Sequence, residues 1–228
     1  MAMDGDQLFL LGRDREDLER SARDLEVRGN RPAAAFKTAV CDLGDWAGFA
    51  AALDAADAAL GQFDTVVVTA GLFATQAALE DDLELTRQVL TVDFAHTVVF
   101  CEHVRRKLLA RGGGTLCVFS SVAGDRGRKP VILYGAAKAG LSHYLEGLDH
   151  KFRAQGLKVV NVKPGFVKTS MTAGLPTPPF AGEPEGVAEL VVRGIARGKP
   201  VVYAPPIWSL IMLVIRMLPR LVMRRIGF

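Results

Sequence analysis

A tyrosine and a lysine stand four residues apart in the segment YGAAK, residues 134–138. On a helix this spacing puts Tyr134 and Lys138 on one face, one turn apart. A neighbouring ammonium group favours the phenolate and lowers the tyrosine pKa from its ordinary value of about 10. The pair can therefore act as a general acid nearer neutral pH. Taken alone, the spacing favours a core tyrosine beside a surface lysine, so the context decides.

A serine stands thirteen residues before this tyrosine, at the end of the strand-like run 115–121, TLCVFSS. Ligands of open α/β sheets bind at the carboxyl ends of the strands, and a hydroxyl group there can hydrogen-bond a substrate oxygen. Ser121 is therefore a third candidate catalytic residue. Ser120 competes for this role, but successive side chains of a strand alternate between faces, so we expect Ser120 to point away.

Apolar strand-like runs alternate with helical patterns along the chain. The expected strands are residues 8–11, 34–40, 64–71, 115–121, 157–165 and 200–205, and the expected helices are residues 14–28, 45–60, 81–110, 131–156 and 184–197. Strands separated by helices imply right-handed crossovers and a parallel sheet, hence a doubly wound α/β fold. We expect Asp14 to cap the first helix and Gly29 to end it. The Pro- and Gly-rich segment 174–186 is expected to be a lid.

The composition argues against several classes of function. The 228 residues are 50% hydrophobic, which suits one domain with a large core. A net charge of +3 without a Lys/Arg run in the body argues against nucleic acid as a partner. Three widely spaced cysteines indicate a reducing compartment, and no Cys/His cluster has metal-site spacing. The acidic start is no signal peptide, so we expect a cytoplasmic enzyme without a metal.

Four motifs, in this order, resemble the short-chain dehydrogenase/reductase (SDR) family. They are VTAG (68–71), Ser121, YGAAK (134–138) and KPGFVKT (163–169), and the resemblance runs from about residue 7 to residue 205. It implies a Rossmann-like fold and an NAD(P)-dependent oxidoreductase that reduces a carbonyl group to a secondary alcohol. It also implies that Tyr134 exchanges a proton with the substrate oxygen, Lys138 holds the nicotinamide ribose, and Ser121 orients the carbonyl group.

The same resemblance assigns residues to a dinucleotide cofactor. Asp42 matches an acidic residue near the adenine, and Arg13 matches a basic residue that often binds a 2′-phosphate, which favours NADP(H) over NAD(H). A surface arginine at a loop start is an equally good interpretation of Arg13. Besides Tyr134 and Lys138, the residues expected to bind the cofactor are Thr69, Ala70, Gly71, Pro164, Gly165, Val167 and Thr169.

Three positions, in two segments, depart from the family pattern. Val68 and Thr69 stand where the family usually has two asparagines, and Asp93 stands where it has an asparagine that holds a water in the proton relay. A carboxylate can accept from the same water, so Asp93 is a fourth candidate catalytic residue. It can also pair with Lys138 and reduce the effect of that lysine on Tyr134. The alternative is a solvated helix residue.

The expected strand LFLL, residues 8–11, matches the second strand of the family pattern. The first strand, the glycine-rich phosphate loop and the first helix of that pattern have no counterpart here. We therefore expect residues 1–205 to be an amino-terminally truncated Rossmann-like domain, from a misassigned start as one hypothesis. The absent strand would lie between residues 8–11 and 64–71 and leave a gap of about 10 Å. A helix N-terminus that binds a pyrophosphate would be absent with it.

Residues 206–228 are expected to form a basic amphipathic tail. Arg216, Arg220 and Arg224 recur every four residues, and the segment has no acidic residue. A cationic amphipathic helix with a tryptophan is typical of a membrane surface. Packing on its own domain or on a partner subunit is the alternative. Pro219 is expected to kink or divide the helix.

These features together predict an NADPH-dependent reductase of a small-molecule or lipid-linked carbonyl compound. The tail and the segments KPGFVKTSMTAGL and VVYAPPIW resemble one branch of the family, the decaprenylphosphoryl-2-keto-ribose reductases. This likeness implies a lipid-linked keto-sugar as substrate and peripheral contact with the inner face of the membrane, and the family implies a homo-oligomer. The alternative function is a non-catalytic remnant that binds a subunit or a membrane. The absent phosphate loop and Asp93 favour the remnant, and the intact catalytic residues favour the enzyme.

Overall fold

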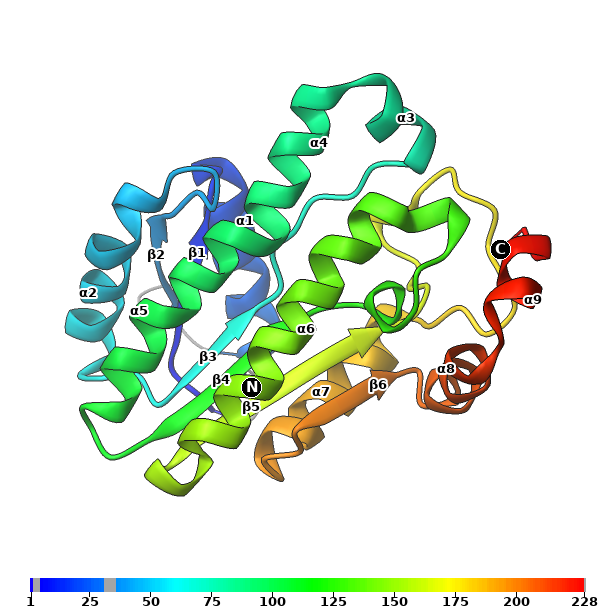
Figure 1. The fold of residues 1–228 in the computed structure, drawn as a ribbon. Helices are drawn as coiled ribbons and strands as arrows, with labels where there is room; N and C mark the ends of the chain where they lie inside the picture. The colour runs from blue at the N-terminus through cyan, green and yellow to red at the C-terminus, as the bar shows by residue number, and fades with distance from the viewer. Residues whose placement is uncertain (2–4, 31–35, 228) are drawn as a thin grey trace.

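The computed structural model describes residue 1 and residues 5–30 and 36–227, and strands and helices alternate along them (Figure 1). The strands are β1 (Leu8–Gly12), β2 (Phe36–Val40), β3 (Thr65–Val68), β4 (Gly114–Phe119), β5 (Leu157–Pro164) and β6 (Val201–Ala204). The helices are α1 (Arg15–Gly29), α2 (Phe49–Leu60), α3 (Gln76–Asp81), α4 (Leu83–Leu90), α5 (Thr97–Leu109), α6 (Ile132–Phe152), α7 (Pro184–Ala196), α8 (Ile207–Met217) and α9 (Arg220–Arg225). The expected alternation is therefore confirmed.

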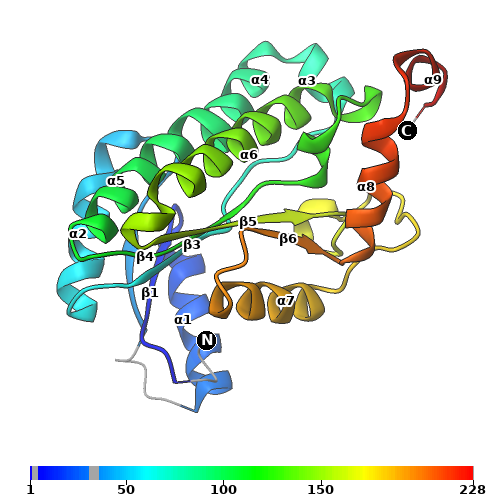
Figure 2. The same ribbon diagram turned by 60° about the horizontal axis from the view of Figure 1, so that its bottom comes forward.

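The strands are parallel, and helices cover both faces of the sheet. Helices α2, α4, α5 and α6 lie on one face, and α1 and α7 lie on the other (Figure 2). The larger core cluster joins α2, α5 and α6 to the buried sides of β3, β4 and β5, with Leu116 and Leu145 fully buried. A second cluster joins α7 to β5 and β6. Such a doubly wound arrangement presents the carboxyl ends of the strands to ligands.

Helix ends follow the predicted local signals closely. The Asp14 side chain accepts a hydrogen bond from the backbone N–H of Asp17, as an N-cap residue does. Asn30 rather than Gly29 ends α1, because Asn30 adopts the left-handed conformation (φ 47°) that closes a helix. Pro219 separates α8 from α9, as expected, because its ring cannot continue a helix.

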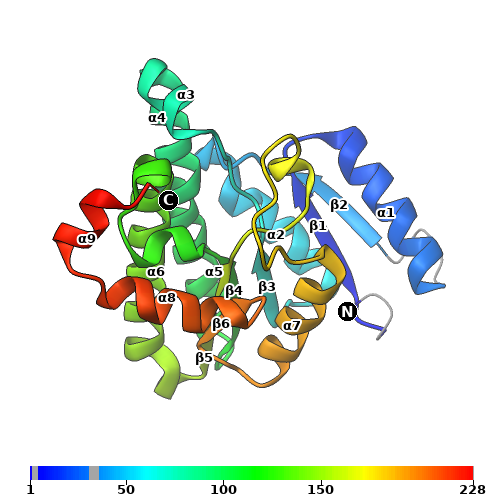
Figure 3. The same cartoon turned by 90° about the vertical axis from the view of Figure 1, so that its right-hand side faces the viewer.

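The sheet is divided in two between β1 and β3. β1 pairs only with β2 in one sheet, and the other sheet has the order β3-β4-β5-β6, as far as the described residues go. β1 lies between β2 and β3 in space (Figures 1 and 3). The edges of β1 and β3 that face each other therefore have no strand partner among the described residues. This is the place at which the sequence predicts an absent strand.

The long helix expected over residues 81–110 is interrupted in its middle. A π-helical turn, Thr91–His96, joins α4 to α5 and carries Asp93. A π-helical turn inserts one residue into the helical repeat, and such turns occur frequently at functional sites. The periodicity of the sequence does not reveal this turn, and its effect is to bring Asp93 into the interior.

Candidate active site

The candidate catalytic side chains meet where the chain leaves the carboxyl ends of β3 and β4. Ser121 follows β4 by two residues, and Tyr134 and Lys138 lie on α6. The Lys138 Nζ atom is 5.6 Å from the centre of the Tyr134 ring. A hydrogen bond with Ser121 favours the phenolate form of Tyr134. The structure thus brings the three predicted residues together.

Ser120 and Ser121 point in different directions, as the alternation of a strand predicts. The Ser120 hydroxyl donates to Asn161 Oδ1 at 2.6 Å and is buried. The Ser121 hydroxyl accepts from the backbone N–H of Ala123 at 3.1 Å and donates weakly to the Pro164 carbonyl at 3.5 Å. Ser120 therefore links the end of β4 to Asn161 on β5, whereas Ser121 faces the site.

Asp93 is fully buried beside these residues, so its interpretation as a solvated helix residue is wrong. One carboxylate oxygen accepts from the backbone N–H of Leu72 at 2.6 Å, and the other lies 3.4 Å from Lys138 Nζ. Gly71 completes the contact: a Cβ atom there would lie 3.1 Å from Asp93 Oδ1 and 3.3 Å from Lys138 Nζ. A larger residue at this position would press on both charged groups, so glycine suits the close approach of the backbone after β3.

The ionisable groups of the site are shifted mainly by burial. Burial raises the pKa of Tyr134, the nearby Asp93 carboxylate raises it further, and Ser121 opposes both. Burial also lowers the pKa of Lys138 and raises that of Asp93. Burial of the phenol, and after it the Asp93 carboxylate, therefore act against the lowering of the Tyr134 pKa that the Lys138 spacing predicts.

The residues predicted for the adenosine half lie at the carboxyl ends of β1 and β2. Arg13 follows Gly12, the last residue of β1, and is exposed. Asp42 follows β2, and its carboxylate accepts from the backbone N–H of Gly44 at 2.7 Å. The Gly12 carbonyl accepts from the backbone N–H of Cys41 at 2.8 Å, which ties the two strand ends together. Arg13 and Asp42 therefore sit at the same edge of the small sheet.

The residues predicted for the nicotinamide half follow β3 and β5. Thr69 and Ala70 are exposed just after β3, before Gly71. At the end of β5, the Pro164 carbonyl accepts from Ser121, and the N–H of the next residue, Gly165, donates to the Ala204 carbonyl at 3.0 Å. The last two predicted residues have separate contacts: Val167 bridges to Gly182, and Thr169 N–H donates to Thr172 Oγ1 at 3.1 Å.

Two aromatic residues beside the site were not predicted from the sequence. Phe73 packs edge-on against Tyr134, with ring centres 5.2 Å apart. The Trp208 indole covers Gly165, where an added Cβ would overlap the Trp208 ring. Phe73 follows the VTAG motif by two residues, and this closeness to a motif of the site is the one sequence signal that could have identified it. No local signal links Trp208 to Gly165, since the two are far apart in the sequence.

The implied dinucleotide fits the carboxyl edge of the sheet at its nicotinamide end but not at its pyrophosphate. On the nicotinamide side, Gly71, Tyr134 and Lys138 converge as described above. A pyrophosphate group needs a helix N-terminus with free N–H groups. At α1, the helix that follows β1, the Asp14 carboxylate already caps that end, and Glu16 and Asp17 add negative charge to the first turn. Among the described residues, no glycine-rich turn replaces it between β1 and β3.

The chain is similar to a known protein family and to several known oxidoreductases. A family model for short chain dehydrogenase matches residues 1–178. An uncharacterized oxidoreductase of Mycobacterium tuberculosis is 33% identical over 223 residues, which cover 97% of this chain and 88% of that protein. The cis-4-hydroxycyclohexanecarboxylate dehydrogenase of Sinomonas cyclohexanicum is 32% identical over 136 residues, 59% of this chain and 55% of that enzyme.

Solved structures agree on the fold. A short-chain dehydrogenase/reductase of unknown function from Caenorhabditis elegans, solved with cofactor, has a TM-score of 0.75 at 20% identity and covers 89% of this chain and 86% of its own. The gluconate 5-dehydrogenase of Burkholderia cenocepacia was solved with NADP and tartrate. It has a TM-score of 0.69 at 22% identity, and the match covers 78% of this chain and 68% of that enzyme. Taken with the family match, these likenesses show that the chain belongs to the short-chain dehydrogenase family of oxidoreductases and has its Rossmann-like fold.

Proposed function

We propose that this oxidoreductase reduces a carbonyl group to a secondary alcohol, with Ser121, Tyr134 and Lys138 as catalytic residues and Asp93 as a positioning residue. The convergence of these side chains at the carboxyl edge of the sheet carries the proposal. A relative named for dehydrogenating a hydroxycyclohexane ring supports an alcohol–carbonyl pair. A non-catalytic remnant is not favoured, because the relatives are oxidoreductases and all three catalytic side chains are present.

In this reaction Tyr134 donates its hydroxyl proton to the substrate oxygen as negative charge develops there. Ser121, which already hydrogen-bonds Tyr134, fixes the same oxygen. A bound nicotinamide supplies the hydride. Lys138 stabilises the tyrosinate that remains, and Asp93 sets how strongly it does so, because it lies 3.4 Å from the ammonium group. Phe73 excludes water from one side of the Tyr134 ring.

The cofactor is proposed to be NADP(H) rather than NAD(H). Support comes from Arg13, an exposed guanidinium at the carboxyl end of β1, since Arg binds phosphate groups through paired N–H donors. We infer that Asp42 contacts the adenine, and that the nicotinamide lies along Thr69, Ala70, Gly71, Pro164, Gly165, Val167 and Thr169. Replacing Arg13 with alanine tests the preference: NADPH affinity is expected to fall and NADH affinity to stay.

We further infer that a parallel strand with a glycine-rich turn belongs between β1 and β3. The unpaired facing edges of these strands support this, since exposed strand edges bind further strands readily. Such a strand would also supply the pyrophosphate site that α1 cannot offer.

The substrate is proposed to be a lipid-linked carbonyl compound such as a keto-sugar, and residues 206–228 are proposed to give peripheral membrane contact. The likeness to the decaprenylphosphoryl-2-keto-ribose reductases suggests the substrate class, and the exposed apolar side of α8 supports the contact. No helix of the described residues is long and apolar enough to cross a bilayer. A homo-oligomer is proposed on the family likeness alone.

Binding of NADPH tests the cofactor site directly. Fluorescence titration would compare this chain with a fusion that supplies a strand and glycine-rich loop ahead of Met1. We expect the fusion to bind and the 228-residue chain to bind weakly. Tight binding by the shorter chain would refute the missing strand, and no binding by either would refute the reductase. A fusion with the loop glycines replaced by alanines is the matched control.

A further inference from the structure

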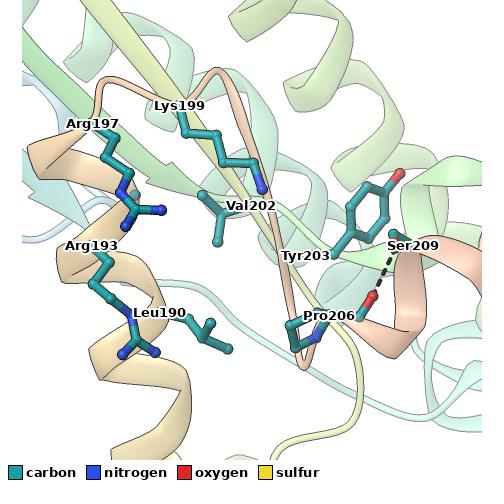
Figure 4. A pocket seen from close by; sticks show the side chains of 9 residues that line it. Leu190, Arg193, Arg197, Lys199, Val202, Tyr203, Pro206 and Ser209 are labelled. Carbon is teal, nitrogen blue, oxygen red and sulfur yellow. Dashed lines mark hydrogen bonds between the residues drawn. The ribbon is translucent and has the colours of Figure 1, made fainter.

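A basic pocket lies between α7, β6 and the start of α8, away from the catalytic residues. Arg193 lines it from the last turn of α7, Arg197 from the residue directly after that helix, and Lys199 from the segment before β6 (Figure 4). Val202 forms part of its apolar wall, and Ser209 belongs to its rim. Its volume of about 160 Å³ exceeds the roughly 30 Å³ share of one water molecule several times.

The positive charge of this pocket is largely unneutralised. Glu189 lies 3.8 Å from Arg193, and among the described residues it is the one carboxylate within ion-pair distance of the three cations. Lys158 adds a further positive charge nearby, since its side chain packs against Gly198, between Arg197 and Lys199. Several cations held together without counter-charges attract an anion of more than one oxygen, and guanidinium groups suit phosphate best.

An exposed apolar stripe on α8 borders the same pocket. Leu210, Leu213, Val214 and Met217 are more than half exposed, whereas Met212 and Ile215 on the opposite side of the helix are buried against Val122. Ser209 stands at the boundary, because it lines the pocket and directly precedes Leu210. The stripe therefore meets the basic pocket along one flank of the helix.

Helices α8 and α9 are attached firmly to the catalytic domain. Arg126 donates to the Leu218 carbonyl at 3.0 Å, and Lys129 donates to the Arg224 carbonyl at 2.7 Å. The exposed apolar stripe is thus carried by a helix that is fixed to the domain, and Figure 3 shows α8 and α9 following one another along this side of the molecule. A basic, acid-free helix pair with such a stripe complements an anionic lipid surface better than a second protein surface of this mildly basic chain.

We propose that the pocket of Arg193, Arg197 and Lys199 binds the phosphate of an anionic phospholipid whose acyl chains lie against the α8 stripe. This site rests on the membrane contact in the proposed function and adds its headgroup chemistry. It would fix the orientation of the protein on the bilayer. Because α8 also carries Trp208, which covers Gly165, this orientation places the catalytic edge near substrates that reside in the bilayer.

Vesicle sedimentation tests the headgroup site. Vesicles of phosphatidylcholine alone are compared with equal parts phosphatidylcholine and phosphatidylglycerol. The variant Arg193→Ala/Arg197→Ala/Lys199→Ala is expected to lose about 100-fold in partition onto the anionic vesicles, since each cation near such a surface contributes a factor of roughly five. Wild-type partition in that variant would overturn the proposal.

A control removes the same charge elsewhere, as Arg15→Ala/Arg23→Ala/Arg106→Ala. These exposed residues lie on α1 and α5, so we expect less than about a twofold loss from this variant. An equal loss in the control would show that net charge alone binds the protein, and would overturn the pocket.

Two further measurements distinguish the lipid site from a site for soluble phosphate and from the proposed reductase activity. Leu213→Glu/Met217→Glu alters only exposed residues and is expected to abolish binding to both kinds of vesicle, with Leu83→Glu as the control. If the wild type ignores vesicles but inorganic phosphate raises its melting temperature through the three cations, the ligand is a soluble phosphate and the lipid site is refuted. None of these readouts uses catalysis, so a failed reductase assay leaves them unchanged.

Discussion

Replacing Asp93 with asparagine is expected to lower the pKa of Tyr134. Asparagine keeps the shape of the side chain and can still accept from the Leu72 N–H, but it removes the charge 3.4 Å from Lys138. The carboxylate raises the Tyr134 pKa itself and also counters the ammonium group. Both effects disappear together in the variant.

The expected size follows from the distance between Lys138 and Tyr134. A unit charge 5.6 Å from the ring interacts by about 3 kcal/mol at an effective dielectric constant of about 20. Full release of that interaction corresponds to about two pKa units. Burial also lowers the pKa of Lys138, so part of its charge is lost once Asp93 is gone. A fall of about one to two pKa units is therefore expected.

Ultraviolet titration of tyrosinate measures this without substrate or cofactor. The chain has three tyrosines, and in the wild type the pKa of each is raised, that of Tyr203 to about 12. In Asp93→Asn one transition should move to lower pH, and adding Tyr134→Phe should remove it. Asp125→Asn is the matched control: the Asp125 side chain is also buried beside a lysine but accepts from Tyr203 and raises its pKa, so this variant should lower the Tyr203 pKa and leave the transition that Tyr134→Phe removes unchanged. Titration curves of Asp93→Asn and wild type that coincide would refute the reasoning.

Three further predictions concern packing, charge and the two serines. Gly165→Ala should cost about 1–3 kcal/mol of unfolding free energy, because the new methyl group overlaps Trp208, and adding Trp208→Ala should recover part of it in urea titrations. Asp57→Asn should cost about 1–3 kcal/mol of unfolding free energy at neutral pH, because Arg111 and Lys107 hold the Asp57 pKa below its ordinary value. That difference should vanish as pH falls through the lowered folded pKa, and a pH-independent difference would contradict it. Ser121→Ala should lower kcat by about 10²–10³ with little change in melting temperature, whereas Ser120→Ala should lower the melting temperature and spare kcat.

Local patterns predicted the elements well because helix ends and strands are encoded by neighbouring residues. Asp14 caps α1 and Pro219 divides the tail, and each acts within one turn of helix. The family motifs likewise identified Ser121, Tyr134 and Lys138, which the fold brings together. Ser120 was assigned to the other face from strand alternation alone.

Long-range contacts were beyond these patterns. The burial of Asp93 depends on a π-helical turn and on a contact with Leu72, twenty-one residues away in the sequence. The raised pKa of Tyr134 follows first from the burial of its own phenol and then from the Asp93 carboxylate, and neither can be read from the Lys138 spacing. Trp208 on Gly165 and the pocket around Arg193 form only when distant segments pack together. In the sequence, the exposed Arg193 on α7 and Arg197 just after it resemble an ordinary solvated helix face.

The most direct test of the account is turnover by the strand-supplied fusion, with Tyr134 and with Tyr134→Phe. Phenylalanine keeps the ring that packs on Phe73 and removes only the hydroxyl. NADPH consumption would be followed with a panel of ketones and keto-sugars, and NADPH binding would be measured beside it. The account predicts that Tyr134→Phe lowers kcat by about 10²–10⁴ while NADPH binding is retained. Equal turnover in the two proteins would contradict the assignment of Tyr134 as the general acid.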